Sequence, residues 1–204
     1  MKRVSLDIHS PAELAAATDL CAATLHQPGA VALVPTETVY GLVCRWDDHA
    51  AVERIYNLKD RSENKPLALF VAAPEQLTRL GVDLPENAIK LATACCPGPI
   101  TIIIPGQEGK TVGFRIPDHP LILQLLRRIG FPLASTSANR SGRPNARTVD
   151  QALAELVGAP DAVVDAGALP ETAQASTVVD LSHGDWRILR EGPISAAAIK
   201  AILS

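Results

Sequence analysis

The chain has 204 residues, and its 47% hydrophobic and 20% charged residues are typical of one globular domain, not of a disordered segment. A net charge of -3 excludes a generally basic surface for nucleic acid, so a polyanion would have to meet a local cluster of cations. Aromatic residues make up only 3% of the chain, too few for a platform on which single-stranded bases stack.

The cysteines and the N-terminal residues indicate the cellular compartment in which the protein is expected. The thiols at positions 21, 44, 95 and 96 form no C-x-x-C pair, and a vicinal pair does not have the spacing of a zinc site. We therefore expect reduced, packed thiols in a cytoplasmic protein. The N-terminus lacks the apolar core of a signal peptide, and no apolar run is long enough to span a membrane. We expect no membrane partner and a single domain over residues 1–204.

The first part of the chain alternates strand and helix patterns. Ser10, Pro11 and Glu13 have the spacing of a capping box with proline at the first helical position, and Pro28 ends the helix that follows. A second helix is indicated by apolar residues at helical spacing. The expected elements are a strand at 4–8, a helix from 11 to about 26, strands at 30–34 and 43–46, a helix from about 49 and a strand at 67–71.

The second part continues the alternation. The expected elements are helices at 74–80 and 85–96, strands at 101–104 and 112–117, a helix at 120–129, strands at 132–134, 162–165 and 186–189, a helix from 148 to Gly158, and a C-terminal helix capped by Ser195. A hairpin connection at 105–110 joins two of the strands. The sequence therefore predicts an α/β fold whose sheet is mixed, not purely parallel.

Residues 35–42 follow a buried strand and place polar groups at its carboxyl end. Pro35 cannot donate to a sheet ladder, so the strand ends or reaches the sheet edge there. Thr36, Glu37 and Thr38 follow, and Gly41 leaves room for a close backbone approach. Polar groups beyond a strand's carboxyl end are where α/β sheets commonly bind ligands.

Two further clusters carry cations and hydroxyls. Lys59 and Arg61 lie at a helix end, where they either complement the helix dipole or clamp a phosphate. Because the apolar face of that helix packs without them, we expect both heads to face solvent. Residues 135–145 combine small hydroxyl, amide and basic groups between a strand and a helix, which suits an anion or nucleotide cradle. Gly109–Thr111 looks like the tail of a P-loop, but Ile104 replaces its required glycine, so we reject that motif.

Five segments in order resemble the YrdC/Sua family, which includes the bacterial TsaC-like threonylcarbamoyl-AMP synthases in their single-domain form. They span roughly residues 30–193, and they are the 35–42 stretch, Lys59-x-Arg61 before a Pro-Leu strand, Arg115-x-Pro-x-His-Pro120, Ser137-x-Asn139, and Ser176–Asp180 with Arg190-x-Gly192. The resemblance implies a twisted open mixed sheet flanked by helices, with a concave basic groove.

The resemblance also implies a reaction, in which L-threonine, bicarbonate and ATP give threonylcarbamoyl-AMP and pyrophosphate for the modification of a tRNA adenosine. No carboxylate cluster marks a metal site, so Mg²⁺ would arrive with ATP. Contact with tRNA and transfer to downstream threonylcarbamoyl-transferase proteins are further implied partners. The implied phosphate and catalytic residues are Lys59 and Arg61, with Arg190 on phosphate; the nucleotide contacts are Thr111, Ser137, Asn139 and Asn145; the threonine site is Thr36, Arg115, Ser135 and Ser176.

Two departures and two alternatives remain open. Phe70 stands where some members have a histidine, and Cys96 stands where the family commonly has tryptophan. One alternative is an RNA-binding module of the same fold without synthase activity. The other is a hydrolase that uses a serine of 135–137 with His119, although no Gly-x-Ser-x-Gly elbow is present. We prefer His119 as a first-turn helix residue after an Asp118 cap.

Overall fold

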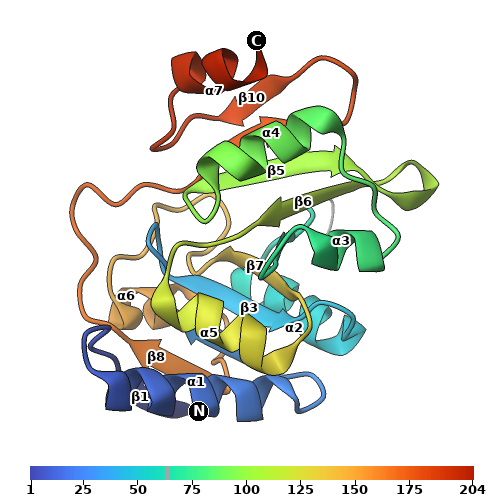
Figure 1. Cartoon of the computed structure of the whole chain (residues 1–204). Helices are drawn as coiled ribbons and strands as arrows, with labels where there is room; N and C mark the ends of the chain where they lie inside the picture. The colour runs from blue at the N-terminus through green and yellow to red at the C-terminus, as the bar shows by residue number, and fades with distance from the viewer. Residues whose placement is uncertain (63–64) are drawn as a thin grey trace.

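The computed structural model describes residues 1–62 and 65–204 (Figure 1). Its ten strands form one sheet in the order β1-β8-β2-β3-β7-β4-β6-β5-β9-β10, with parallel and antiparallel pairs, which confirms the expected open mixed sheet flanked by helices. The strands are β1 (Lys2–Ser5), β2 (Val31–Val34), β3 (Gly41–Arg45), β4 (Ala68–Phe70), β5 (Ile100–Pro105), β6 (Thr111–Arg115), β7 (Leu133–Ser137), β8 (Ala162–Asp165), β9 (Thr177–Asp180) and β10 (Arg187–Arg190).

The helices lie where the periodicity predicts them, with ends shifted by a few residues. They are α1 (Pro11–Leu25), α2 (His49–Lys59), α3 (Glu75–Arg79), α4 (Glu86–Cys95), α5 (Pro120–Ile129), α6 (Val149–Glu155) and α7 (Ala196–Leu203), with a short 3₁₀ turn at Gln107–Gly109. In Figure 1, α1 and α5 lie at the end of the sheet that holds β1 and β8, whereas α4 and α7 lie at the end that holds β10. Within the described residues, no helix is both long and apolar enough to cross a membrane.

Three apolar clusters hold the layers together. One joins α1 and α5 to the sheet, a second joins α2 and α6 to the opposite face of the same strands, and a third packs α3, α4 and α7 on β5, β6 and β9. Side chains alternate between the faces of a strand, so Ile100, Ile102 and Ile104 of β5 enter the third cluster while Thr101 and Ile103 face the other way. The face opposite α4 and α7 therefore carries small and polar side chains in place of a packed core.

Several local expectations need correction. Strand β7 runs on to Ser137, beyond the predicted end at 134, because residues 135–137 pair with β3. Ser10 caps α1 by accepting from the Glu13 amide, but the Glu13 carboxylate accepts from the Asp7 amide, so the capping box is not reciprocal. The N-cap of α5 is His119, one residue after the expected Asp118, and its side chain makes no capping bond.

His119 is buried, and its Nδ1 atom has no hydrogen-bond partner among the described residues. Burial lowers the pKa of His119 below its ordinary 6.5, while Glu37 and Asp118 oppose that shift. Between the pKa of His119 in the folded state and 6.5, the unfolded chain binds more protons than the native state. The free energy of unfolding therefore rises with pH in this range and falls on acidification.

We expect His119→Asn, which keeps a good N-cap and does not titrate, to reduce the loss of stability between about pH 7 and about pH 5. Urea unfolding at both pH values measures the difference. The same change at the exposed His183 is the control. An acid sensitivity identical to that of the parent would show that His119 is not its source.

Candidate functional site

A pocket of about 440 Å³ lies over the uncovered face of β4, β5, β6 and β9. It is closed by segment 36–41, by Arg61 with residues 65–67, and by residues 175–178 with Arg190. We call it the central pocket. Its size falls in the range of small-molecule sites. Eight of the eleven predicted site residues line it, namely Thr36, Arg61, Thr111, Arg115, Ser135, Ser137, Ser176 and Arg190. The structure thus brings together groups that lie up to 154 positions apart in the sequence, from Thr36 to Arg190.

Register explains why these side chains meet. Ala68 of β4 lies opposite Ser135 of β7, and Phe70 of β4 lies beside Arg115 of β6, so all four point to one face of the sheet. Gly41 of β3 pairs with Ser137, and a Cβ at this glycine would come within 3.2 Å of the Thr136 carbonyl oxygen. The expected close backbone approach at Gly41 is confirmed.

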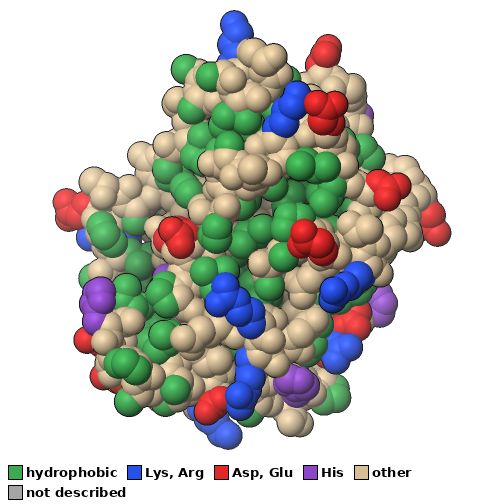
Figure 2. Space-filling view, in the orientation of Figure 1, with side chains coloured by type: hydrophobic (Ala, Val, Ile, Leu, Met, Phe, Trp, Pro, Cys, Tyr) green, Lys and Arg blue, Asp and Glu red, His purple; other side chains and the backbone are tan. Residues whose placement is uncertain are grey.

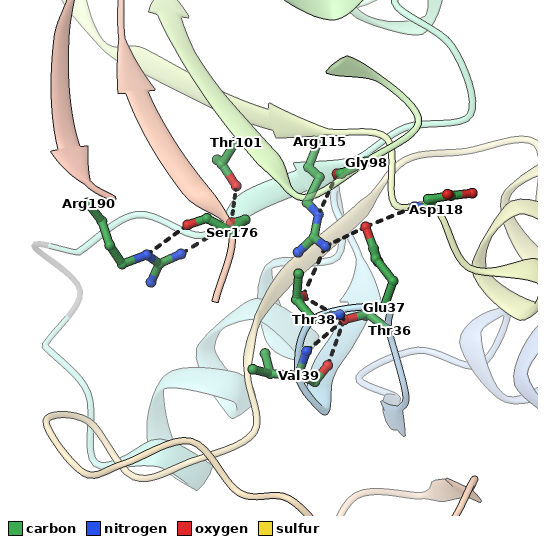
Figure 3. Close-up of polar contacts among 10 residues, drawn as sticks. All are labelled: Thr36, Glu37, Thr38, Val39, Gly98, Thr101, Arg115, Asp118, Ser176 and Arg190. Atoms are coloured by element: carbon green, nitrogen blue, oxygen red, sulfur yellow. Dashed lines mark hydrogen bonds and ion pairs between the residues drawn. The ribbon is translucent and has the colours of Figure 1, made fainter. Parts of the chain in front are cut away.

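The Thr36–Val39 turn is fixed by the Thr36 hydroxyl (Figure 3). This oxygen accepts from the amides of Thr38 and Val39, donates to the Val39 carbonyl at 2.7 Å and lies 2.8 Å from the Thr38 hydroxyl. Thr36 and Thr38 are both buried. The turn is therefore a rigid wall of the central pocket.

Arg115 is 5% exposed, and the surrounding chain holds its guanidinium on two sides. Nε donates to the Gly98 carbonyl at 3.3 Å, and Nη2 donates to the Thr38 hydroxyl at 2.9 Å and forms an ion pair with Glu37 at 2.7 Å. The guanidinium carbon also lies 5.7 Å from the centre of the Phe70 ring. The aromatic ring of Phe70 thus lies against the cation.

A second guanidinium stands across the central pocket (Figure 3). Arg190 donates from Nε to the Ser176 carbonyl at 2.9 Å and from Nη2 to the Ser176 hydroxyl at 3.2 Å. That hydroxyl also lies 2.9 Å from the hydroxyl of Thr101. Burial, and then the charge of Arg115, lower the pKa of Arg190, because the pocket holds the two cations near each other.

Arg61 and Lys65 add positive charge at the pocket rim. Arg61 donates to the carbonyls of Lys65 and Pro66, at 3.1 and 3.3 Å, and burial lowers its pKa. With Arg115 and Arg190 they make four cations, and no acidic residue is among the described residues that line the pocket. The face shown in Figure 2, by contrast, carries acidic and basic side chains interspersed. The arrangement suits a ligand with more than one anionic group.

Lys59 does not face solvent, so the expectation drawn from its helix was wrong. It is 1% exposed, and its ammonium donates to the backbone carbonyls of Ser137 and Asn139. Its own carbonyl accepts from the Ser141 amide at 3.2 Å. Burial, with a smaller effect of Arg61, lowers the pKa of Lys59 to about 8, so it remains protonated at neutral pH. Lys59 fastens the 137–141 segment and does not line the central pocket.

Two other predicted residues also lie outside the lining. Asn139 is buried and donates to the carbonyls of Arg140 and Arg143, so it shapes the same segment. Its Oδ1 atom is buried without a partner among the described residues. Asn145 is exposed. From the sequence, no role is assigned to Lys65 or Glu37, although Glu37 lies within residues 35–42, where the sequence predicts a ligand-binding site.

Comparisons with known proteins agree with this architecture. The model of the Sua5/YciO/YrdC family, described as telomere recombination, matches residues 24–192. The threonylcarbamoyl-AMP synthase of Pyrococcus abyssi is 33% identical over 191 residues, 89% of this chain and 56% of the relative. The enzyme of that name from Bacillus subtilis is 35% identical over 192 residues, 89% of this chain and 55% of the relative. The chain therefore spans little more than half the length of these two relatives.

Among solved structures, Pyrococcus abyssi Sua5 in complex with L-threonine superposes with a TM-score of 0.85 at 30% identity. The match covers 99% of this chain and 60% of that one. The family model covers well over half of the chain, and the sheet order, the central pocket and the sequence segments are consistent with one family. The chain belongs to the Sua5/YciO/YrdC family.

Proposed function

We propose that the protein is an L-threonylcarbamoyl-AMP synthase, a nucleotidyltransferase that acts on L-threonine, bicarbonate and ATP in the cytoplasm. The observation that carries the proposal is the central pocket, where Arg115 and buried hydroxyls adjoin three further cations. A guanidinium suits the α-carboxylate of an amino acid, and Arg61, Lys65 and Arg190 suit the phosphates of ATP with its Mg²⁺. The names of the relatives support the same activity.

The reaction needs anions to be brought together. The threonine amine adds to bicarbonate with loss of water to give a carbamate, whose oxygen attacks the α-phosphorus while pyrophosphate leaves. The carbamate, the substrate carboxylate and the triphosphate repel one another, so fixed cations must offset that repulsion and the charge on the leaving group. Ser135 and Ser176 would hold the amino acid against the turn that Thr36 fixes, while Thr111, Ser137 and Asn145 would contact the nucleotide. Positioning then supplies most of the catalysis, since no nucleophile of the protein is required.

The direct test incubates the purified chain with ATP, L-threonine and bicarbonate and follows pyrophosphate and the adenylate. Pyrophosphate release that requires all three substrates supports the proposal. Release that does not depend on threonine would indicate another nucleotide enzyme. No release, with binding of tRNA retained, would favour an RNA-binding module without synthase activity, and transfer to tRNA by downstream proteins would remain to be shown with those proteins.

We expect the pocket to prefer threonine to valine. The Ser135 hydroxyl donates to the Ala68 carbonyl at 3.0 Å and keeps its lone pairs to accept from the substrate hydroxyl. A site built around such a bond leaves a buried partner unpaired when valine binds, so valine should be used at least about a hundredfold less efficiently. Competition of the two amino acids in the pyrophosphate assay measures the ratio. Comparable kcat/KM values would contradict the assignment of the hydroxyl site.

A further inference from the structure

We infer that Glu37 is a positioning residue, which acts through Arg115 to set the affinity for the amino-acid substrate. Glu37 does not line the central pocket, so it is not placed to touch the substrate. Its Oε1 atom forms the 2.7 Å ion pair with Arg115 Nη2 and also accepts from the Asp118 amide at 2.9 Å. The carboxylate thus ties the start of α5 to the guanidinium that faces the pocket.

The contacts of Arg115 divide its donors into two sets. Nε and Nη2 are occupied by Gly98, Glu37 and Thr38, whereas Nη1 donates to no residue that the structure describes. In Figure 3, the rest of the guanidinium points away from Glu37, toward the side where Ser176 and Arg190 lie. Glu37 and Thr38 therefore fix Nη2, a donor that the substrate does not use. By doing so they orient the guanidinium so that Nη1 faces the pocket.

The second carboxylate oxygen of Glu37, Oε2, indicates that this arrangement lowers the free energy of unfolding. Oε2 is buried and has no hydrogen-bond partner among the described residues, although the side chain as a whole is 18% exposed. A buried carboxylate oxygen without a donor opposes folding, so a carboxylate that served only stability would be poorly placed here. Orientation of Arg115 accounts for its position, because Oε1 is the atom that both fixed contacts share.

Charge and orientation make opposite predictions for this carboxylate. If only charge mattered, removal of Glu37 would strengthen binding of the substrate carboxylate, because a negative neighbour of Arg115 is lost. If orientation matters, removal of Glu37 weakens binding of the substrate carboxylate, because a misoriented Arg115 guanidinium cannot make a bidentate contact. Glutamine separates the two, since its amide oxygen can replace Oε1 as an acceptor without the charge.

The test compares Glu37→Gln and Glu37→Ala with the parent, with Glu86→Ala on the exposed face of α4 as a matched control. We expect the alanine variant to raise the KM for threonine by on the order of tenfold, the glutamine variant by about threefold at most, and both to leave the KM for ATP within about twofold. Calorimetric binding of L-threonine alone should follow the same order. The Glu86 variant should match the parent.

Three outcomes would overturn the inference: an unchanged threonine KM in Glu37→Ala, a lowered one, or equal rises in both KM values together with a lower melting temperature. If the alanine variant does not fold, Glu37→Asp carries the test, because its shorter side chain keeps the charge but draws the oxygen away from Arg115. The inference rests on the proposed function. A parent without threonine-dependent pyrophosphate release would refute that function, whereas an active parent that is indifferent to position 37 would refute this inference alone.

Discussion

Lys59→Met should both destabilise the protein and nearly abolish adenylate formation. The change removes the donor of two backbone carbonyls, at Ser137 and Asn139, in a side chain that is 1% exposed. Each unsatisfied buried carbonyl costs about 1–3 kcal/mol, and the relief of no longer burying an ammonium offsets part of this. We expect a net loss of about 2 kcal/mol, which lowers the melting temperature of a chain of this size by roughly 4–8 °C.

The loss of activity would follow from misplacement, not from a missing phosphate ligand. A displacement of about 1 Å in a positioned group can cost about a hundredfold in rate, and Ser137 itself lines the central pocket. Thermal melts, the pyrophosphate assay and amide exchange at Ser141, whose amide donates to Lys59, test the three consequences together. Lys90→Met, at an exposed site on α4, is the control. Lost activity with unchanged melting and exchange would instead make Lys59 a direct phosphate ligand.

Arg61→Ala should give a contrasting result, with little change in stability and a large loss of activity. Its guanidinium lines the central pocket and, among the described residues, donates to the carbonyls of Lys65 and Pro66, so its loss should cost roughly half a kcal/mol. Removal of one preorganised donor from developing charge costs about 10²–10³ in kcat. Arg61→Lys should also be impaired, because an ammonium cannot replace a bidentate fork.

The pyrophosphate assay and thermal melts on the same preparations provide the measurement. Arg128→Ala is the matched control, since this arginine of α5 is exposed and forms an exposed ion pair with Asp19 at 3.2 Å. Turnover of Arg61→Ala within a few-fold of the parent would remove the phosphate-clamp assignment. A melting temperature lowered as far as that of Lys59→Met would show that Arg61, too, is structural.

Much of this architecture was predictable from local pattern. Caps and the helical spacing of apolar residues indicated the helices, and short apolar runs indicated the strands other than β9. The resemblance to the family supplied the eight predicted residues that line the central pocket. Lys59 shows where such reasoning fails. The apolar residues of α2 complete a buried face without Lys59, which predicts a solvent-facing ammonium. Lys59 nevertheless lies four residues after the fully buried Ile55 and so shares its face.

The contacts that matter most at the site are made by backbone atoms distant in sequence. The carbonyls of Ser137 and Asn139 bind Lys59 from 78 and 80 positions away, and the Gly98 carbonyl binds Arg115 from 17 positions away. Every residue has a carbonyl, so no residue type in the sequence marks which one will accept. The Asp118 amide, just before the observed N-cap at His119, likewise finds its acceptor far away in sequence, in the Glu37 carboxylate 81 positions earlier.

Strand β10 ends the sheet, and β9 is its one neighbour among the described strands, with a register irregularity between Ile188 and Arg190. A strand with one neighbour can separate from the sheet at a smaller free-energy cost than an interior strand. Arg190, a cation of the central pocket, is the last residue of this strand. Fraying of β10 would thus withdraw one wall of the pocket while the interior strands stay folded, and a bound anion would oppose that opening. Occupancy of the pocket and order at this edge of the sheet are therefore thermodynamically linked.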